Sequence, residues 1–160
     1  MNNNIQIETG KELKLDNVAS FRKKMKQTDV QQEVQRFVNI LKDSETQKKG
    51  PMISATFGLE QVNGEQVLDM EFMVPIDRKV DLPEGYKVKP IFHLMHALYT
   101  RYIGKPELIQ HTYKELMDCL SDKKLQQITV AYNVNINDDK VSQGEEPIID
   151  IYIGVNPNIC

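Results

Sequence analysis

Three histidines and two cysteines are the side chains in this sequence best suited to bind a metal or act as a nucleophile. His93 and His96 lie three residues apart in a segment that we expect to be a strand, so they face opposite sides and cannot hold one ion together. His111 falls in an expected helix, among acids that should be solvated. Cys119 lies in the same helix, Cys160 ends the chain, and neither belongs to a cluster with metal-ligand spacing. We therefore expect no metal and no cofactor, and structural or surface roles for the histidines.

Motifs for covalent catalysis and for phosphate binding are absent from the sequence. No serine is flanked by the glycines of a nucleophile elbow, and no glycine-rich loop is suited to cradle a phosphate. A hydrolase would also need a positioned acid–base pair, which no pattern in the chain indicates. The sequence therefore predicts a protein that is not an enzyme.

Carboxylates and tyrosines remain as residues suited to recognise a ligand. The two acids Glu71 and Asp150 alternate with apolar residues, so both should project from the polar face of a strand. Tyrosine combines an apolar ring with a polar hydroxyl, which suits it to a binding cleft. The candidate ligand-binding residues are Glu71, Tyr99, Tyr132, Tyr152 and Asp150, with Arg101 as a group able to cap an anion. The plainer alternative is that the acids solubilise an open sheet face and the tyrosines fill strand positions.

Composition and charge argue against several classes of partner. The chain has 160 residues, of which 40% are apolar and 27% charged, and its net charge of −3 gives no electrostatic case for nucleic acid. The basic run Arg22–Lys26 would alternate between the two faces of a strand and so form no binding stripe. No apolar stretch approaches the roughly 20 residues of a membrane span, and the N-terminus lacks a secretory signal. With so few cysteines, these features predict a cytoplasmic protein that binds neither nucleic acid nor membranes.

Two amphipathic helices should help to position these residues. The first is expected from Thr28 to Lys42, where Thr28-Asp29-Val30-Gln31 fits a capping box. The second is expected from Lys105 to Asp122 and carries a proline in its first turn. Apolar residues recur at helical spacing in both, so each helix should bury one stripe, with Phe37 in the first and Leu116 in the second.

Six further segments have the composition and alternation of strands. Asn63-Gly64 should join two of them in a hairpin, because this dipeptide suits a tight turn. The polar segment from Asp138 to Glu146 is expected to be a loose connection. The expected strands are Val18–Lys26, Met52–Val62, Val67–Pro75, Ile91–Tyr102, Ile128–Asn137 and Ile149–Val155, with a short additional one at Ile5–Ile7.

The order of these elements repeats along the chain. A strand, a helix and a hairpin occupy about residues 17 to 75, and the same series occupies about residues 88 to 156. We predict a single α+β domain over residues 1–160, in which duplicated β-α-β-β units form an antiparallel sheet with two helices side by side on one face. The other face of the sheet would then be free for a ligand or a partner.

The second repeat resembles a known family. Its segment 97–108, ALYTRYIGKPEL, resembles the strand, glycine turn and helix start of GyrI-like proteins. Ile136-Asn137-Asp138 resembles the strand end before the loop, and segment 150–155, DIYIGV, resembles the closing strand. This family includes the effector-binding domains of bacterial multidrug-responsive transcription regulators and a gyrase-inhibitory protein. In element order the resemblance covers nearly the whole chain.

The resemblance implies a cleft near a pseudo-twofold axis, where drug-sensing members place aromatic residues and a buried glutamate against cationic, apolar ligands. Such a site works because aromatic faces attract cations and an unpaired buried carboxylate favours a positive guest. Two alignments place either Asn133 or Val130 at the glutamate position, and neither is acidic. A cationic ligand would then need Glu71, Asp69 or Asp150 to supply the charge.

Two functions follow as expectations. The first is a non-enzymatic, GyrI-like effector-binding module that takes a small aromatic or amphipathic ligand on the sheet face opposite the helices. The alternative is a protein–protein interaction module, an inhibitor or chaperone-like partner protein with no small-molecule ligand. Only about 17 residues precede the first repeat, so we expect a stand-alone module without the helix-turn-helix domain usual in these regulators. A concave, aromatic-lined cleft favours the first function, and a flat face with exposed apolar residues favours the second.

Overall fold

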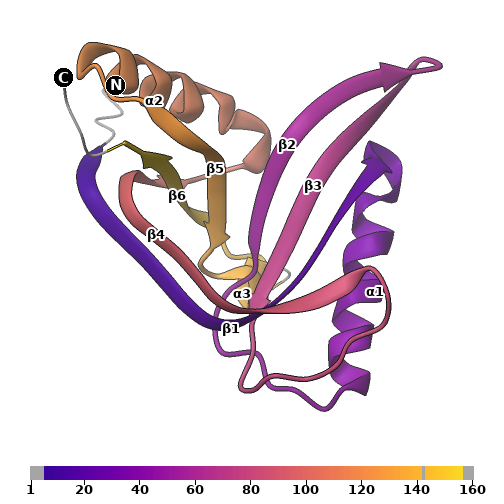
Figure 1. Cartoon of the computed structure of the whole chain (residues 1–160). Coiled ribbons are helices and arrows are strands. Elements are labelled where there is room, and N and C mark those ends of the chain that lie inside the picture. Colours follow the sequence, from indigo (N-terminus) through magenta and orange to yellow (C-terminus); the bar gives the residue numbers. More distant parts are fainter. Residues whose placement is uncertain (1–5, 142, 157–160) are drawn as a thin grey trace. The chain divides into compact units, whose positions relative to one another are not determined.

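A computed structural model describes residues 6–141 and 143–156 of the chain (Figure 1). The chain divides into two compact units, of which one comprises Leu15–Phe92 and the other Met1–Lys14 with His93–Cys160. They are called the 15–92 unit and the 93–160 unit below. The described residues form six strands and three α-helices, and the strands within each unit pair antiparallel, so the expected α+β class is confirmed. No helix in the described part of the chain is long and apolar enough to cross a membrane.

The 15–92 unit is built on a three-stranded antiparallel ladder. Strand β3 (Glu65–Pro75) pairs with β1 (Glu8–Lys26) on one side and with β2 (Ile53–Val62) on the other. The predicted hairpin between β2 and β3 is confirmed: Asn63 and Gly64 have φ angles of 54° and 79°, the left-handed pair that a type I′ turn requires.

Helix α1 (Val30–Asp43) packs against the strands and contributes Phe37 and Leu41 to the hydrophobic core of this unit. Phe37 is fully buried, and its ring centroid lies 5.0 Å from that of Phe21 on β1 in an edge-to-face contact. Phe21 in turn stacks on Phe72 of β3 at 5.5 Å. Aromatic pairs at these separations add attraction to the burial of apolar surface, so the predicted helical stripe is also the centre of the core.

The 93–160 unit repeats this plan with different residues. Strand β6 (Ile148–Val155) pairs with β4 (Tyr86–Ile103) and with β5 (Gln127–Asn135). Helix α2 (Gln110–Asp122) buries Leu116 and Leu120 in one cluster with Ile151 and Ile153 of β6. Leu116 is fully buried, as predicted.

Both units therefore share one order of pairing, in which the third strand lies between the first and the second. The order is β1–β3–β2 with α1 in the 15–92 unit and β4–β6–β5 with α2 in the 93–160 unit. Each helix has a separate hydrophobic cluster within its own unit. Duplication, a single domain and side-by-side packing of the two helices stay predictions.

The boundaries of several elements differ from those expected. β1 begins at Glu8 rather than Val18, so Ile7 precedes it as coil, and Ile5 lies outside the described residues. β4 begins at Tyr86 and so takes in the end of the expected crossover. The loose connection after β5 contains a short helix, α3 (Asp138–Val141), whose Lys140 and Val141 amides donate to the Asn137 carbonyl oxygen.

The predicted capping box at Thr28 is wrong. Residues Gln27–Asp29 form a 3-10 turn, and α1 starts only at Val30 with no side-chain hydrogen bond at its N-cap. A local 3-10 turn satisfies first-turn amides through backbone oxygens, which removes the need for a capping side chain. A 3-10 turn at Pro106–Leu108 delays the start of α2 in the same way.

The basic residues of the run on β1 form ion pairs with acidic residues of the same unit. Arg22, Lys23, Lys24 and Lys26 form ion pairs with Asp69, Glu33, Glu60 and Glu65, respectively. These cations are about half exposed or more, so each pair contributes little to stability. The run is a solvated, charge-balanced surface, as expected from its alternation.

Candidate functional site

Three tyrosines form a row across the strands of the 93–160 unit. Tyr152 on β6 lies directly opposite Tyr99 on β4 and Tyr132 on β5. Residues directly opposite each other share one face of a sheet, and the Tyr99 and Tyr152 ring centroids are 5.0 Å apart. Ile151 and Ile153, the neighbours of Tyr152 in sequence, pack against α2. The tyrosine row therefore lies on the sheet face away from α2.

The next row on this face contains Asp150, a buried carboxylate whose charge is paired with a cation. Arg101 on β4 lies opposite Asp150 on β6 and binds both of its oxygens, with Nε at 2.7 Å and Nη2 at 3.1 Å. The hydroxyl of Tyr99 donates a third hydrogen bond to Asp150 at 3.0 Å. Asp150 is only 6% exposed, so these three donors replace the water that its charge has lost.

The tyrosine hydroxyls of this site resist ionisation. Burial and the hydrogen bond to Asp150 raise the pKa of Tyr99 to about 12. Burial is the main cause that raises the pKa of Tyr152, and the negative charge of Asp150 raises this pKa further. Both phenols therefore stay protonated at neutral pH, and Tyr99 acts as a hydrogen-bond donor rather than as a base.

The first residues of β1 complete the surroundings of Tyr99. The Lys11 ammonium lies 5.4 Å from the centroid of the Tyr99 ring. The same ammonium is 3.3 Å from the carboxylate of Glu8, three residues earlier in β1. The site thus contains two ion pairs, Lys11 with Glu8 and Arg101 with Asp150.

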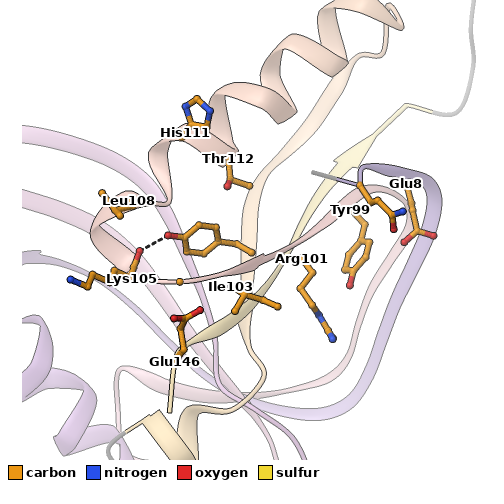
Figure 2. Close-up of a pocket in the computed structure, with 12 residues that line it drawn as sticks. Glu8, Tyr99, Arg101, Ile103, Lys105, Leu108, His111, Thr112 and Glu146 are labelled. Atoms are coloured by element: carbon orange, nitrogen blue, oxygen red, sulfur yellow. Dashed lines mark hydrogen bonds between the residues drawn. The ribbon is translucent and has the colours of Figure 1, made fainter. Parts of the chain in front are cut away.

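A pocket of about 1170 Å³ opens beside Tyr99 and Arg101 (Figure 2). In Figure 2 the side chains of Tyr99 and Arg101 extend from β4 in the same direction, away from α2. The apolar side chains Ile103 and Leu108 on the pocket wall are 57% and 64% exposed, respectively. The remaining lining residues are Gln6, Glu8, Tyr102, Gly104, Lys105, His111, Thr112 and Glu146.

Gly104 shapes the turn on which this pocket depends. Its φ of 151° is unfavourable for other residues, and an added Cβ would lie 2.9 Å from the Tyr102 hydroxyl oxygen. That hydroxyl donates to the backbone oxygen of Lys105 at 2.6 Å, the bond drawn in Figure 2. The glycine therefore lets Tyr102 close the turn between β4 and α2.

Four of the five predicted site residues lie together, and Glu71 is in the other unit. Within the 15–92 unit, Glu71 occupies the same register position as Asp150, because it lies opposite Arg22 on β1 and Ala55 on β2. It is 5% exposed, and Lys89 donates to its Oε2 at 2.6 Å. The plainer alternative that both acids solubilise an open face is wrong, since both carboxylates are buried and each is bound by a cation.

The two units differ at the positions of the tyrosines. In the 15–92 unit the row that corresponds to Tyr99, Tyr152 and Tyr132 is Ser20, Met73 and Ile53. These three side chains are at most 1% exposed, whereas Tyr99 and Tyr152 are only half-buried. The aromatic row is therefore a feature of the 93–160 unit.

The position that the family resemblance assigned to a glutamate faces the other way. Asn133 lies opposite Ile151 on the side of α2, and its amide donates to the hydroxyl of Tyr113 on that helix. Its Oδ1 is buried and has no hydrogen-bond partner among the described residues. The other candidate, Val130, is half-buried on β5. Neither residue brings a carboxylate to the tyrosine row.

Metal-ligating residues are dispersed in the described part of the chain, which contains no group of three or more histidine, cysteine or acidic side chains placed to hold an ion. His93 lies 2.6 Å from a carboxylate oxygen of Glu12 in a single pair. Cys119 is half-buried beside the core of α2. The predicted absence of a zinc site stays a prediction.

Sequence comparison identifies no relative, because no family model matches the chain and no curated protein matches it significantly. Among solved structures it is similar to the EcmrR C-terminal domain, with 14% identity over 96% of this chain and 98% of that one, and a TM-score of 0.77. EcmrR in its DNA complex within EcmrR-RPo matches with 13% identity over 95% of this chain and a TM-score of 0.77. The chain spans 57% of the length of that EcmrR chain.

Two further structures match with lower scores. SAV2435 bound to tetraphenylphosphonium shares 10% identity over 96% of this chain and 94% of that one, with a TM-score of 0.51. A hydrolase encoded by lin2189 from Listeria innocua shares 13% identity over 95% of this chain and 91% of that one, with a TM-score of 0.55. At these identities the likeness concerns the fold alone. The chain therefore has the fold of the EcmrR C-terminal domain, which agrees at the level of the fold with the resemblance to GyrI-like effector-binding domains.

Proposed function

We propose that the chain is a non-enzymatic small-molecule-binding module of GyrI-like type, with its ligand against the tyrosine row of the 93–160 unit. The observation that supports this most directly is the row itself, because the Tyr99 ring lies 5.0 Å from that of Tyr152 and lines a pocket of about 1170 Å³. Ligand sites are concave and combine apolar surface with placed polar groups, and this pocket offers aromatic, aliphatic and charged side chains together. The fold it shares with SAV2435, whose structure holds tetraphenylphosphonium, adds support.

The ligand best suited to these residues is a small aromatic or amphipathic molecule. The Tyr99 ring and the exposed side chains of Ile103 and Leu108 offer apolar contact, and the half-exposed Arg101 offers polar contact. Asp150 binds Arg101 and Tyr99 and so has no surplus charge to attract a cation. We assign no catalytic role to Tyr99 or Asp150, since the carboxylate is held as a structural acceptor and the phenol is kept protonated.

A screen of small aromatic molecules, neutral and cationic, tests this proposal by thermal shift and calorimetry. We expect binding to wild type that Tyr152→Ala weakens, because the substitution removes one ring of the row and leaves Tyr99 unsupported. Tyr152→Phe serves as the matched control: it keeps the ring and should keep the binding of apolar ligands. Binding that Tyr152→Ala leaves unchanged would remove the tyrosine row from the site.

A protein–protein interaction module is the second candidate, and one observation favours it. Ile103 and Leu108 lie near each other in sequence and are both more than half exposed, as is common where a partner docks. Under this alternative no small molecule in the screen would bind, and Leu108→Ser would weaken a purified complex without changing the melting temperature of the free protein. Ligand binding that depends on Tyr152 would decide against it.

A further inference from the structure

The Tyr99 ring already has a cation on it, and that cation belongs to this chain. Lys11 reaches over the ring from β1, with its ammonium nitrogen 5.4 Å from the ring centroid. This is within the distance of about 6 Å at which an aromatic face attracts a cation. Lys11 therefore occupies the position that the positively charged group of a ligand would take on this tyrosine.

The carboxylates near the ring are also engaged. Glu8 pairs with the ammonium of Lys11 at 3.3 Å, and Asp150 is held by two guanidinium nitrogens of Arg101 and by the Tyr99 hydroxyl. Lys11, Arg101, Glu8 and Asp150 thus balance one another. A cation that entered this cluster would add an uncompensated positive charge close to an ammonium and a guanidinium group.

Displacing Lys11 gives a cationic ligand no net advantage. The ligand would gain the contact with the ring and with Glu8, but Lys11 would lose the same two contacts. A neutral aromatic molecule adds no charge to this cluster, so it meets no electrostatic repulsion from the ammonium of Lys11 or the guanidinium of Arg101. The local charge pattern therefore disfavours cationic ligands more than neutral aromatic ones.

We propose that Lys11 determines the charge preference of the tyrosine site, by acting as a built-in cation that excludes positively charged ligands in favour of neutral aromatic ones. This inference rests on the proposed function, since it concerns the ligand class of the same site. Lys11 acts here as a specificity-determining residue: it competes for the ring face instead of contributing binding energy to the ligand.

Phenyltrimethylammonium and tert-butylbenzene provide a direct test, because they have the same shape and differ by one permanent charge. Their dissociation constants are measured by calorimetry or by ligand-observed nuclear magnetic resonance for wild type and for Lys11→Met. Wild type should bind the neutral probe more tightly. Lys11→Met should shift the ratio of the two affinities towards the cation by about two- to thirtyfold, the range expected for a cation–π contact.

Three variants control for other causes. Lys14→Met removes the same charge from the same strand, where burial alternates from the half-buried Lys11 to the exposed Lys14 and so places Lys14 on the other face; it should leave the ratio unchanged. Lys11→Arg keeps a cation over the ring and should behave as wild type does. Glu8→Gln added to Lys11→Met should reverse part of the gain, because it removes the carboxylate that Lys11→Met leaves unpaired.

The outcomes separate this inference from the proposed function. An affinity ratio that is the same in wild type and Lys11→Met would overturn the role of Lys11, and the proposed function would stand if binding still depends on Tyr152. A wild type that prefers the cation would overturn the role of Lys11 as well. Binding of neither probe to any variant would overturn both proposals together.

Discussion

Removal of the Tyr99 hydroxyl tests the charge network directly. Tyr99→Phe keeps the ring that stacks on Tyr152 and deletes only the donor that lies 3.0 Å from Asp150. A hydrogen bond to a charged group stabilises a fold by about 1.5–3 kcal/mol. Arg101 still binds Asp150 in the variant, and Tyr99 is only half-buried, so we expect the free energy of unfolding at neutral pH to fall by about 1–2 kcal/mol.

The pH dependence of this effect gives a sharper test. The pKa of Tyr99 is raised from its usual value of 10.0 to about 12 in the folded protein. Between these values the unfolded chain has lost the phenolic proton and the folded protein retains it, so unfolding releases a proton and stability falls as pH rises. A raised folded-state pKa of this kind contributes stability that is complete below pH 10 and is lost towards pH 12. The difference of about 1–2 kcal/mol in unfolding free energy between wild type and Tyr99→Phe should therefore shrink across this range, and most of it should be lost towards pH 12.

Urea unfolding followed by circular dichroism, at a series of pH values from neutral to alkaline, measures this difference. Comparison with the variant cancels the titration of the groups that do not interact with Tyr99. Tyr102→Phe is the chemical control, since its hydroxyl donates to the uncharged backbone oxygen of Lys105 and its loss should cost about 0.5–1 kcal/mol. The reasoning is refuted if wild type and Tyr99→Phe lose stability in parallel above pH 10, or if Tyr99→Phe is as stable as wild type at neutral pH.

Three further outcomes are expected. Phe37→Ala and Leu116→Ala should each lower the free energy of unfolding by about 2–5 kcal/mol in urea titrations, because both side chains are fully buried, and a loss below 1 kcal/mol would contradict their place in the cores. Arg101→Met should lower the free energy of unfolding by about 1–3 kcal/mol, because it leaves Asp150 buried without its cation. Arg22→Met, at the same register position of the other unit, should lower it by about 1 kcal/mol or less, because its ion pair is exposed. Equal losses of stability would contradict this difference between a buried and an exposed ion pair. Purified protein dialysed against a weak chelator should retain no stoichiometric zinc by elemental analysis, and retention would show that a site had been overlooked.

Local patterns in the sequence predicted the two long helices, the hairpin and the polar face of β6. Helical spacing placed Phe37 and Leu116 in the cores, and Asn63-Gly64 set the hairpin, because both signals depend only on neighbouring residues. Alternation likewise placed Asp150 and Tyr152 on the face opposite the apolar stripe of β6. The side-chain period of a strand is a property of the backbone itself, so it can be inferred without knowledge of the partner strands.

Only the tertiary structure decided which groups meet on that face. Arg101 and Asp150 are 49 residues apart in sequence, and their pairing depends on the register of β4 against β6. Lys11 meets Tyr99 only because β1 begins earlier than its composition indicated. Ionic and aromatic contacts act over a few ångströms, whereas alternation specifies a face and not a neighbour. The sequence therefore determined that a polar and aromatic face exists, and the fold determined that its charges are balanced.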